Sequence, residues 1–316
     1  MKAITTFRTP EFLQQELRNE FPQVDFSFHK HISFAEKEIK QADIIITYGE
    51  DLTNQHLTQA KSLKWIMVAS AGLDKLPAEI IEEREILVTN ARGIHKIPMA
   101  EFTLGLMLQH VKMFKTLWKQ EEEVTWYKKL PVQELYGKTI MIVGAGAIGR
   151  EIARLANAFR MNVIGVNSDG RLVEGFSSIY RLDQMVKGLP AADFVISVLP
   201  STEKTRYIYE QKHFAAMKTE AVFINVGRGD VVEEEVLIEA LNNKEISHAF
   251  IDVFEVEPLP ANHPFWTMEN ITVTPHISSH SKNYLVRAIE IFKKNLHTYL
   301  NGGNNYINVV DLKRGY

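Results

Sequence analysis

Three polar side chains follow predicted strands in the second half of the chain. Together they could transfer a proton beside a bound carboxylate. They are Arg228 in NVGRGD, Glu257 in DVFEVEPLP and His276 in TVTPHISS. An arginine fork can clamp a carboxylate, a histidine can give or take a proton near neutral pH, and a glutamate can stabilise an imidazolium. Taken singly, each residue has a structural explanation, such as a solvated side chain or a turn. The chemistry therefore depends on all three acting beside a bound cofactor.

A candidate cofactor cradle lies upstream, where residues 138–159 combine an apolar run, the turn GAGAIG and apolar positions at helical spacing. Gly144 permits a tight turn, Gly146 lets the backbone approach a pyrophosphate, and Gly149 lets the helix pack closely on its strand. The phosphates would be held by backbone N–H groups at the helix start, those of Ala147 and Ile148. An ordinary tight turn is the alternative. With a nicotinamide bound here, the three polar side chains describe reversible hydride transfer to a 2-oxo acid.

The strand that follows the cradle ends in Asn167 and Ser168, with Arg171 after a short turn. An Asp or Glu at this strand end accepts hydrogen bonds from the adenosine ribose hydroxyls of NAD, whereas a neutral residue with a nearby Arg suits the 2′-phosphate of NADP. Asn167 holds the expected acidic position, so the sequence favours NADP(H) over NAD(H). The alternative stays open because Asp169 would restore a carboxylate if the strand end shifted by one or two residues.

Length and composition restrict the class of protein. With 316 residues, the chain can form two domains with substantial cores. Hydrophobic residues make up 45% and charged residues 24%, and no apolar run reaches bilayer-spanning length, which argues against disorder and membrane insertion. The net charge of −3 provides no basic surface for nucleic acid, and the absence of cysteine excludes disulfides and thiolate metal sites, so we expect no bound metal. The start lacks the apolar core of a signal peptide, so we expect a cytoplasmic protein.

Strands and helices alternate along most of the chain, which predicts an α/β architecture with parallel sheets. Within residues 1–97, the segment Ser70-Ala71-Gly72 follows a strand at the end where ligands collect, and it could bind an anion or be an ordinary turn. Pro98 opens one long helical stretch with a wide apolar surface, which could connect domains, form a dimer or pack in the core. Two βαβαβ halves then fit within residues 98–285, which predicts a doubly wound sheet.

The motifs occur in an order that resembles the D-isomer-specific 2-hydroxyacid dehydrogenase family across nearly the whole chain. The matching segments are SAGLD at 70–74, MAEFTLGLML at 99–108, GAGAIG at 144–149, LPST at 199–202, NVGRGDVV at 225–232, DVFEVEPLP at 252–260 and TPHIS at 274–278. The resemblance implies two Rossmann-like doubly wound parallel-sheet domains, the second inserted in the first. Residues 1–97 with 286–316 would form the substrate-binding domain and residues 98–285 the dinucleotide-binding domain. The helix after Pro98 would help to form a homodimer.

The resemblance also implies a role for each matching site residue. Arg228 would bind the substrate carboxylate and carbonyl, His276 would be the acid/base, and Glu257 would be its partner. The substrate carboxylate would also be held at Ser70 and by the backbone of Ala71 and Gly72. The cofactor would contact the glycine turn, the strand end at Asn167, Ser168 and Arg171, and the residues Thr103, Leu199, Pro200, Ser201, Thr205, Val226, Gly227 and Asp252. Of these, Asp252 would bind the nicotinamide amide.

Departures from the family pattern narrow the expected reaction. Asn167 replaces the acidic residue of NAD-using members and resembles the NADP-using branch with its downstream Arg. Formate-oxidising members carry Gln where this chain has Glu257, and phosphite-oxidising members carry a Lys in the loop that Ala71 occupies here, so neither chemistry is expected. No regulatory domain follows before Tyr316, which disfavours a serine-biosynthesis member.

We therefore expect NADP(H)-dependent reduction of a small 2-oxo acid, such as glyoxylate or hydroxypyruvate, with His276 as the acid/base. Two alternatives stay open. A nucleotide-sensing corepressor or scaffold of the same fold would bind NADPH tightly without turnover, and another oxidoreductase of this fold would act on a different substrate. A panel of 2-oxo acids assayed with both cofactors separates these possibilities.

Overall fold

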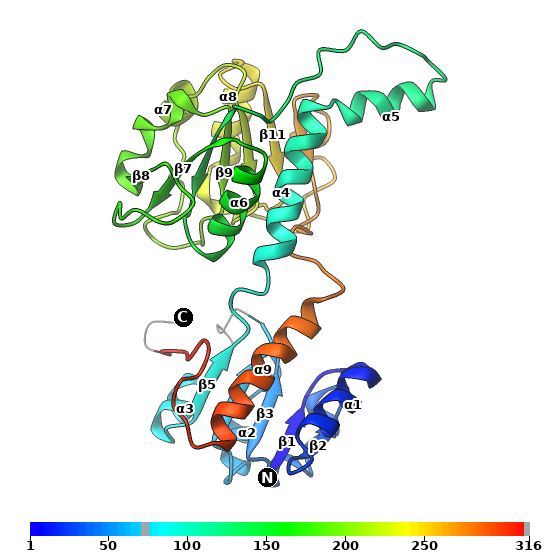
Figure 1. Ribbon diagram of the computed structural model, residues 1–316, viewed down its shortest axis with the longest axis vertical. Helices are drawn as coiled ribbons and strands as arrows, with labels where there is room; N and C mark the ends of the chain where they lie inside the picture. The colour runs from blue at the N-terminus through cyan, green and yellow to red at the C-terminus, as the bar shows by residue number, and fades with distance from the viewer. Residues whose placement is uncertain (71–75, 313–316) are drawn as a thin grey trace. The chain divides into compact units, whose positions relative to one another are not determined.

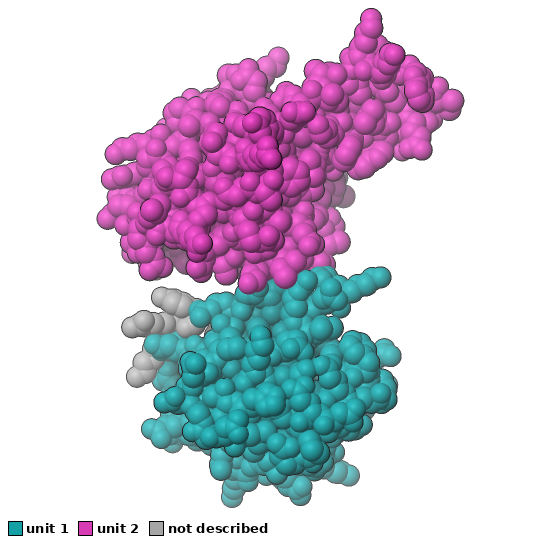
Figure 2. All heavy atoms as spheres, in the orientation of Figure 1, with its two compact units in different colours: residues 1–94, 281–316 teal, residues 95–280 magenta. Residues whose placement is uncertain are grey.

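The computed structural model describes residues 1–70 and 76–312, and the chain forms two compact units (Figure 2). Unit 1 contains Met1–Ile94 and Ser281–Tyr316, and unit 2 contains His95–His280. Each unit is built around a parallel β-sheet with helices (Figure 1), which confirms the predicted fold class of two parallel-sheet α/β domains, the second inserted in the first. The units divide at 94/95 and 280/281, whereas the sequence predicts divisions at 97/98 and 285/286.

Unit 1 has a five-stranded parallel sheet in the order β2-β1-β3-β4-β5. Its strands are β1 (Lys2–Thr5), β2 (Asp25–Phe28), β3 (Ile44–Thr47), β4 (Trp65–Val68) and β5 (Leu87–Asn90). Its helices are α1 (Glu11–Glu20), α2 (Asn54–Gln59), α3 (Ala78–Glu83) and α9 (Tyr284–Leu300), with the short 3-10 turns η1 (Ile32–Phe34) and η2 (Ile39–Gln41). The central strands β3 and β4 read IIIT and WIMV and are fully buried, because apolar cores cover both faces of the sheet.

The chain returns to unit 1 through α9, which packs beside α1 (Figure 1). Trp65 of β4 stacks on Phe292 of α9, with the ring centroids 5.2 Å apart. After α9 the chain runs along β5, where the Asn90 N–H donates a hydrogen bond to the Asn308 carbonyl at 3.1 Å. Unit 1 is therefore completed by residues from both ends of the chain.

Unit 2 has a seven-stranded parallel sheet in the order β12-β11-β10-β9-β6-β7-β8. Its strands are β6 (Thr139–Val143), β7 (Asn162–Asn167), β8 (Ser178–Arg181), β9 (Phe194–Ser197), β10 (Val222–Asn225), β11 (His248–Ile251) and β12 (Ile271–Val273). Its helices are α4 (Lys96–Val111), α5 (Phe114–Glu122), α6 (Ala147–Ala158), α7 (Gln211–Ala215) and α8 (Glu234–Asn242), with the 3-10 turns η3 (Leu182–Lys187), η4 (Leu189–Ala191), η5 (Gly229–Val231) and η6 (Pro264–Trp266). The strand order reverses between β6 and β9, and ligands of such sheets bind beyond the carboxyl ends of the strands at this point.

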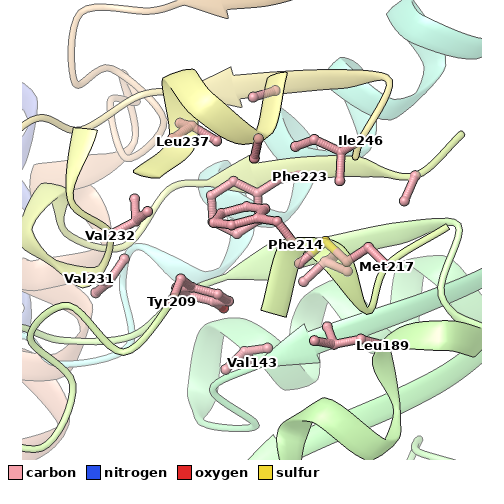
Figure 3. Packing of buried hydrophobic residues seen from close by; sticks show 14 of the residues in the cluster. Val143, Leu189, Tyr209, Phe214, Met217, Phe223, Val231, Val232, Leu237 and Ile246 are labelled. Atoms are coloured by element: carbon pink, nitrogen blue, oxygen red, sulfur yellow. The ribbon is translucent and has the colours of Figure 1, made fainter. Parts of the chain in front are cut away.

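The strands of unit 2 are apolar on both sides because each face of the sheet packs into its own core. In β6, Met141 and Val143 belong to one core, whereas Ile140 and Ile142 belong to the other. The core that contains Val143 also holds aromatic side chains from the strand and helix regions around it (Figure 3). This burial on two sides explains the uninterrupted apolar run before the glycine turn.

The helical stretch around Pro98 forms two helices, so the expectation of one long helix is wrong. Pro98 lies in the first turn of α4, which begins at Lys96 and ends at Val111. Met113 then adopts a left-handed conformation with φ of 56°, which breaks the helix before α5. The break lets α4 stay packed in unit 2 while α5, whose residues are all exposed or half-buried, extends away from it (Figure 1). No helix in the described part of the chain combines the length and apolarity needed to cross a bilayer.

Candidate active site

The glycine turn between β6 and α6 has the geometry of a phosphate-binding loop. Gly144 has φ of 113°, a conformation that residues with a side chain rarely adopt. A Cβ on Gly149 would lie 2.2 Å from the Gly144 carbonyl oxygen. The helix can pack this closely on the turn only because Gly149 has no side chain. A Cβ on Gly146 would meet no described atom within 4 Å, which leaves that side of the turn open. The N-cap residue of α6 is Gly146, which has no side chain to cap the helix, so the turn and the helix start fit a bound pyrophosphate.

The side chain of Asn167 closes the loop after β7. Its Oδ1 accepts a hydrogen bond from the Gly170 N–H at 2.6 Å, and its Nδ2 donates to the Arg171 carbonyl at 2.9 Å. Arg171 is exposed, and its Nε lies 3.6 Å from Asp169 Oδ2, with Ser168 exposed beside them. The residues predicted to select the cofactor therefore lie together at one strand end, where the Asn167 amide also holds the shape of the loop.

The segment after β9 is tied to the loop that carries Arg228. The Thr205 hydroxyl donates to the Pro200 carbonyl at 2.6 Å, which folds the segment back on itself. The Ser201 hydroxyl donates to Asp230 Oδ2 at 2.5 Å, two residues beyond Arg228. The bond to Asp230 joins the predicted cofactor segment to the loop that carries Arg228.

Two further predicted cofactor contacts have their own structural roles. A Cβ on Gly227 would lie 2.5 Å from the Leu199 carbonyl oxygen, so the Val226-Gly227 backbone packs directly on the segment after β9. Thr103 is buried in α4, where its hydroxyl donates to the Met99 carbonyl at 2.8 Å. The backbone contact explains why the second glycine-containing motif, NVGRGD, needs a residue without a side chain at position 227.

His276 and Glu257 form a direct pair. The His276 Nδ1 atom lies 2.7 Å from Glu257 Oε2, while Glu257 Oε1 accepts a hydrogen bond from the Phe254 N–H at 3.0 Å. The His276 side chain is 44% exposed, so its ring can be reached from solvent. The backbone of His276 is left-handed, with φ of 50°, and its N–H donates to the Asp252 carbonyl at 2.8 Å. This arrangement orients the imidazole through one carboxylate.

Arg228 lies on the adjacent loop, outside the His276–Glu257 pair. It follows β10 and precedes η5, and its Nη1 donates to the Gly227 carbonyl at 2.7 Å. A Cβ on Gly229 would lie 2.0 Å from the carbonyl carbon of Phe254. The loop that carries Arg228 and the loop that carries Glu257 are therefore in direct contact.

Asp252 is buried and holds the loop that carries His276. Its Oδ1 accepts hydrogen bonds from the Thr274 hydroxyl at 2.6 Å and the Ile277 N–H at 3.0 Å, and its Oδ2 accepts one from the Ser278 N–H at 3.0 Å. The two oxygens thus bind residues on both sides of His276. Sequence reasoning missed this positioning role, because a carboxylate contact between distant segments leaves no local pattern. The predicted contact of Asp252 with a nicotinamide amide stays a prediction.

His95, just before α4, is another candidate that the sequence patterns did not single out. Burial lowers the pKa of its imidazole, and the nearby charges of Arg228 and His280 lower it further. Its position before Pro98 signals a helix start and carries no sign of a site. Within the described ranges, no group of three or more His, Asp or Glu side chains is arranged to hold a metal ion.

In unit 1, Ser70 lies just after β4, at the carboxyl end of the sheet. Its hydroxyl donates to the Tyr48 carbonyl at 3.4 Å. The predicted substrate residues Ala71 and Gly72 lie outside the described residues. The role of this segment in holding a carboxylate stays a prediction.

Comparison with known proteins relates most of the chain to one family. The family described as D-isomer specific 2-hydroxyacid dehydrogenase, NAD binding domain, matches residues 104–278. Glyoxylate/hydroxypyruvate reductase B of Klebsiella pneumoniae subsp. pneumoniae is 31% identical over 313 residues, which cover 95% of this chain and 95% of that protein. Among solved structures, a D-isomer specific 2-hydroxyacid dehydrogenase family protein from Aeromonas salmonicida subsp. salmonicida is 31% identical, with 98% of each chain covered and a TM-score of 0.84.

A second solved structure is the NADPH-dependent glyoxylate/hydroxypyruvate reductase of Sinorhizobium meliloti in complex with NADP and sulfate. It is 26% identical, covers 100% of this chain and 99% of its own, and has a TM-score of 0.76. The similarity spans both units, and the glycine turn and the His276–Glu257 pair lie within the matched domain. The chain therefore belongs to the D-isomer specific 2-hydroxyacid dehydrogenase family and is an oxidoreductase.

Proposed function

We propose that this protein uses NADPH to reduce a small 2-oxo acid, such as glyoxylate or hydroxypyruvate, to the corresponding 2-hydroxy acid, in the D configuration where C2 is chiral. The observation that carries the proposal is the 2.7 Å contact between His276 Nδ1 and Glu257 Oε2. The loop that carries Glu257 packs against the loop that carries Arg228. The names of two relatives, both glyoxylate/hydroxypyruvate reductases, support the substrate class.

Arg228 holds the substrate in this proposal. A guanidinium has its N–H donors in a rigid fork, so it can bind a carboxylate through two charge-assisted hydrogen bonds. The bond from Nη1 to the Gly227 carbonyl at 2.7 Å restrains the fork. The remaining donors can face the carboxylate and the adjacent carbonyl of a 2-oxo acid, which polarises the carbonyl for reduction.

His276 supplies the proton. With a proton on Nδ1 shared with Glu257, the proton that is transferred lies on Nε2, and the carboxylate stabilises the imidazolium before transfer. When bound, the nicotinamide cofactor supplies the hydride that adds to C2 of the oxo acid. The Nε2 proton goes to the carbonyl oxygen, so the C=O group becomes CH–OH and His276 is left neutral. Asp252 keeps the loop of His276 in place during this exchange.

NADP(H) is proposed over NAD(H) because the strand end that meets the adenosine ribose is neutral at Asn167 and has Arg171 in the same loop. The carboxylate of Asp169, in the same loop, lies 3.6 Å from the Arg171 Nε, where the guanidinium offsets its charge. The name of the Sinorhizobium meliloti relative, an NADPH-dependent enzyme, supports this choice.

The proposal includes a homodimer formed through α5 and the segment after it. This part of unit 2 extends away from the sheet (Figure 1). It exposes large apolar side chains, including Trp118, Val124, Trp126 and Tyr127. Trp126 is 95% exposed, and apolar side chains gathered in this way are typical of protein interfaces. Light scattering coupled to size-exclusion chromatography gives the mass of the particle and tests this part.

The catalytic proposal is tested with a panel of 2-oxo acids, each assayed with NADH and with NADPH by the absorbance of the reduced nicotinamide. We expect turnover of a small 2-oxo acid with NADPH, and a loss of about 10²-fold or more in kcat for His276→Ala. An undiminished rate in His276→Ala would refute the acid/base role. Tight binding of NADPH without turnover would instead favour a nucleotide-binding protein without catalytic activity.

A further inference from the structure

A second arginine, Arg181, lies at the same strand end as Asn167. Strands β7 and β8 are parallel neighbours, and in their register Asn167 is paired with Arg181. Because the carboxyl ends of parallel strands meet at one edge of the sheet, Arg181 lies at the edge where the adenosine ribose of a bound dinucleotide is expected. A loop and the first part of β8 separate Arg181 from Arg171 in the sequence, so no short motif links the two arginines.

The loop after β7 packs directly on the stem of Arg181. Gly170 has φ of 75°, and a Cβ added to it would lie 2.7 Å from Arg181 Cγ. The two bonds of the Asn167 side chain, to the Gly170 N–H and the Arg171 carbonyl, hold the loop in this position. The loop that carries Arg171 is therefore packed against the side chain of Arg181.

Each of the two arginines is paired with an aspartate that a stronger anion can replace. Arg171 Nε lies 3.6 Å from Asp169 Oδ2, and Arg181 Nε lies 3.1 Å from Asp183 Oδ1. The arginine side chains are 79% and 54% exposed, and ion pairs this exposed contribute little to stability. A phosphate group has more charge than one carboxylate and several acceptor oxygens, so it competes well for both guanidinium groups.

We propose that Arg181 and Arg171 together bind the 2′-phosphate of NADPH, which makes Arg181 a second determinant of cofactor choice. The inference rests on the proposed NADP(H)-dependent function and adds a residue to it. The two guanidinium groups approach the phosphate from the ends of adjacent strands, Arg171 from the loop and Arg181 from the edge strand. Asp169 and Asp183 neutralise the arginines when no phosphate is bound.

The test is isothermal titration calorimetry of the full chain with 2′,5′-ADP, which carries the 2′-phosphate, and with 5′-AMP, which lacks it. We expect Arg181→Ala to raise the Kd for 2′,5′-ADP by about tenfold or more, because a charge-assisted contact is lost, and to leave the Kd for 5′-AMP unchanged. Arg181→Gln keeps the stem on which Gly170 packs and should have the same effect. Arg154→Ala is the matched control, since Arg154 is an exposed arginine on α6 paired with Glu151.

The outcomes separate this inference from the proposed function. If the parent protein prefers 2′,5′-ADP and both Arg181 variants retain that preference, the role of Arg181 is wrong while NADP(H) dependence stands. If the parent binds 5′-AMP as tightly as 2′,5′-ADP, the NADP(H) preference itself is wrong. A loss of affinity for both ligands in Arg181→Ala and Arg181→Gln would indicate a structural role and would also overturn the inference.

Discussion

The Nδ1 atom of His276 lies 2.7 Å from the Oε2 atom of Glu257, whose other carboxylate oxygen accepts a hydrogen bond from the Phe254 N–H. One carboxylate therefore orients the imidazole and holds its own loop at the same time. Since that loop packs on the loop of Arg228, the geometry of the three predicted catalytic residues depends on a few short contacts.

Glu257→Gln removes the charge of this carboxylate at nearly constant volume. The amide has one acceptor oxygen, so it cannot accept from both the Phe254 N–H and a protonated His276 ring, and it no longer stabilises the imidazolium. We expect kcat for reduction of a 2-oxo acid to fall by about 10- to 100-fold, with the Kd for 2′,5′-ADP unchanged. An unchanged kcat in steady-state assays would show that the charge of Glu257 is not needed.

Asp252→Asn tests whether the buried carboxylate positions His276. An amide offers one acceptor oxygen, so at least one of the three groups now bonded to Asp252 would face an N–H donor. We expect a loss of about 1–3 kcal/mol in the free energy of unfolding, together with a lower kcat. Thr274→Val is the matched control, because it removes the hydroxyl bond and leaves the carboxylate. If Asp252→Asn unfolds in urea like the parent and keeps its kcat, the positioning role is refuted.

Gly146, which precedes α6, and Gly149, in its first turn, should respond differently to substitution by alanine. Gly149→Ala places a Cβ 2.2 Å from the Gly144 carbonyl oxygen, so the helix must shift and unit 2 should be less stable. Gly146→Ala meets no described atom within 4 Å, so the protein should fold normally but bind NADPH less tightly, because the methyl group occupies the side open to the pyrophosphate. Thermal unfolding and NADPH titration of both variants provide the comparison. Undiminished NADPH affinity in Gly146→Ala would contradict the assignment of the cradle.

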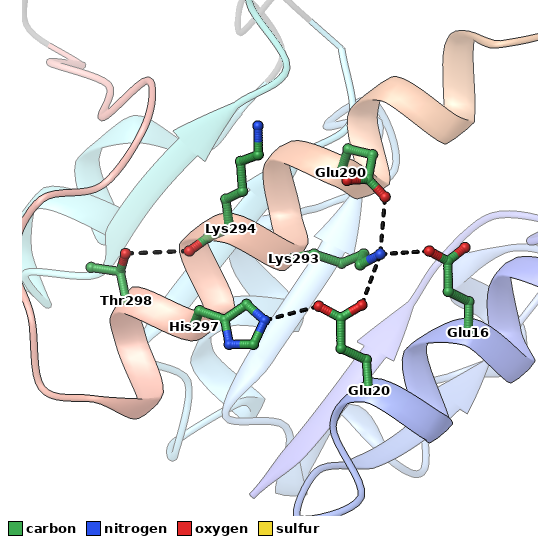
Figure 4. A network of polar contacts seen from close by, with 7 residues as sticks. All are labelled: Glu16, Glu20, Glu290, Lys293, Lys294, His297 and Thr298. Atoms are coloured by element: carbon green, nitrogen blue, oxygen red, sulfur yellow. Dashed lines mark hydrogen bonds and ion pairs between the residues drawn. The ribbon is translucent and has the colours of Figure 1, made fainter.

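Lys293 links helix α9 to helix α1 in unit 1 through ion pairs (Figure 4). Its ammonium group pairs with Glu16, Glu20 and Glu290, and its side chain is nearly buried. Lys293→Met would leave three carboxylates without their shared cation, so we expect a loss of about 1–3 kcal/mol in the free energy of unfolding. Urea unfolding followed by tryptophan fluorescence, to which buried Trp65 contributes, measures it. The neighbouring exposed Lys294, changed to Met, should unfold like the parent.

Stability of unit 2 should decrease in mild acid because of His248. Burial lowers the pKa of His248 to about 3, and the nearby His110 adds to the effect. Below the ordinary histidine pKa of about 6.5, the unfolded chain binds a proton that the folded chain does not. The free energy of unfolding therefore decreases as the pH is lowered, by roughly 2 kcal/mol at about pH 5. His248→Gln, which can keep the bond to Thr272, should reduce this pH dependence when urea unfolding is compared at neutral pH and at the acidic pH. An equal dependence in both proteins would refute the assignment.

Several features could be predicted from the sequence because they depend on local patterns. The apolar run, the glycines and the helical spacing at 138–159 specify a strand, a turn and a helix that lie next to one another in the chain. Strands that alternate with helices specify parallel sheets, because a parallel connection needs a crossover. The motif order also led to Glu257 and His276 as partners, and the structure places them 2.7 Å apart.

The tertiary structure decided the contacts between segments that no local pattern links. The break at Met113 has no Gly or Pro to signal it and follows from the packing of α4 against unit 2 while α5 stays exposed. Asp252 holds the loop of His276, and Arg181 lies beside Asn167, because strand order and register bring these residues to one edge of the sheet. The sequence by itself determined the fold class, the family and the types of side chain at the site. Their bonding partners depend on how distant strands pair, which periodicity does not encode.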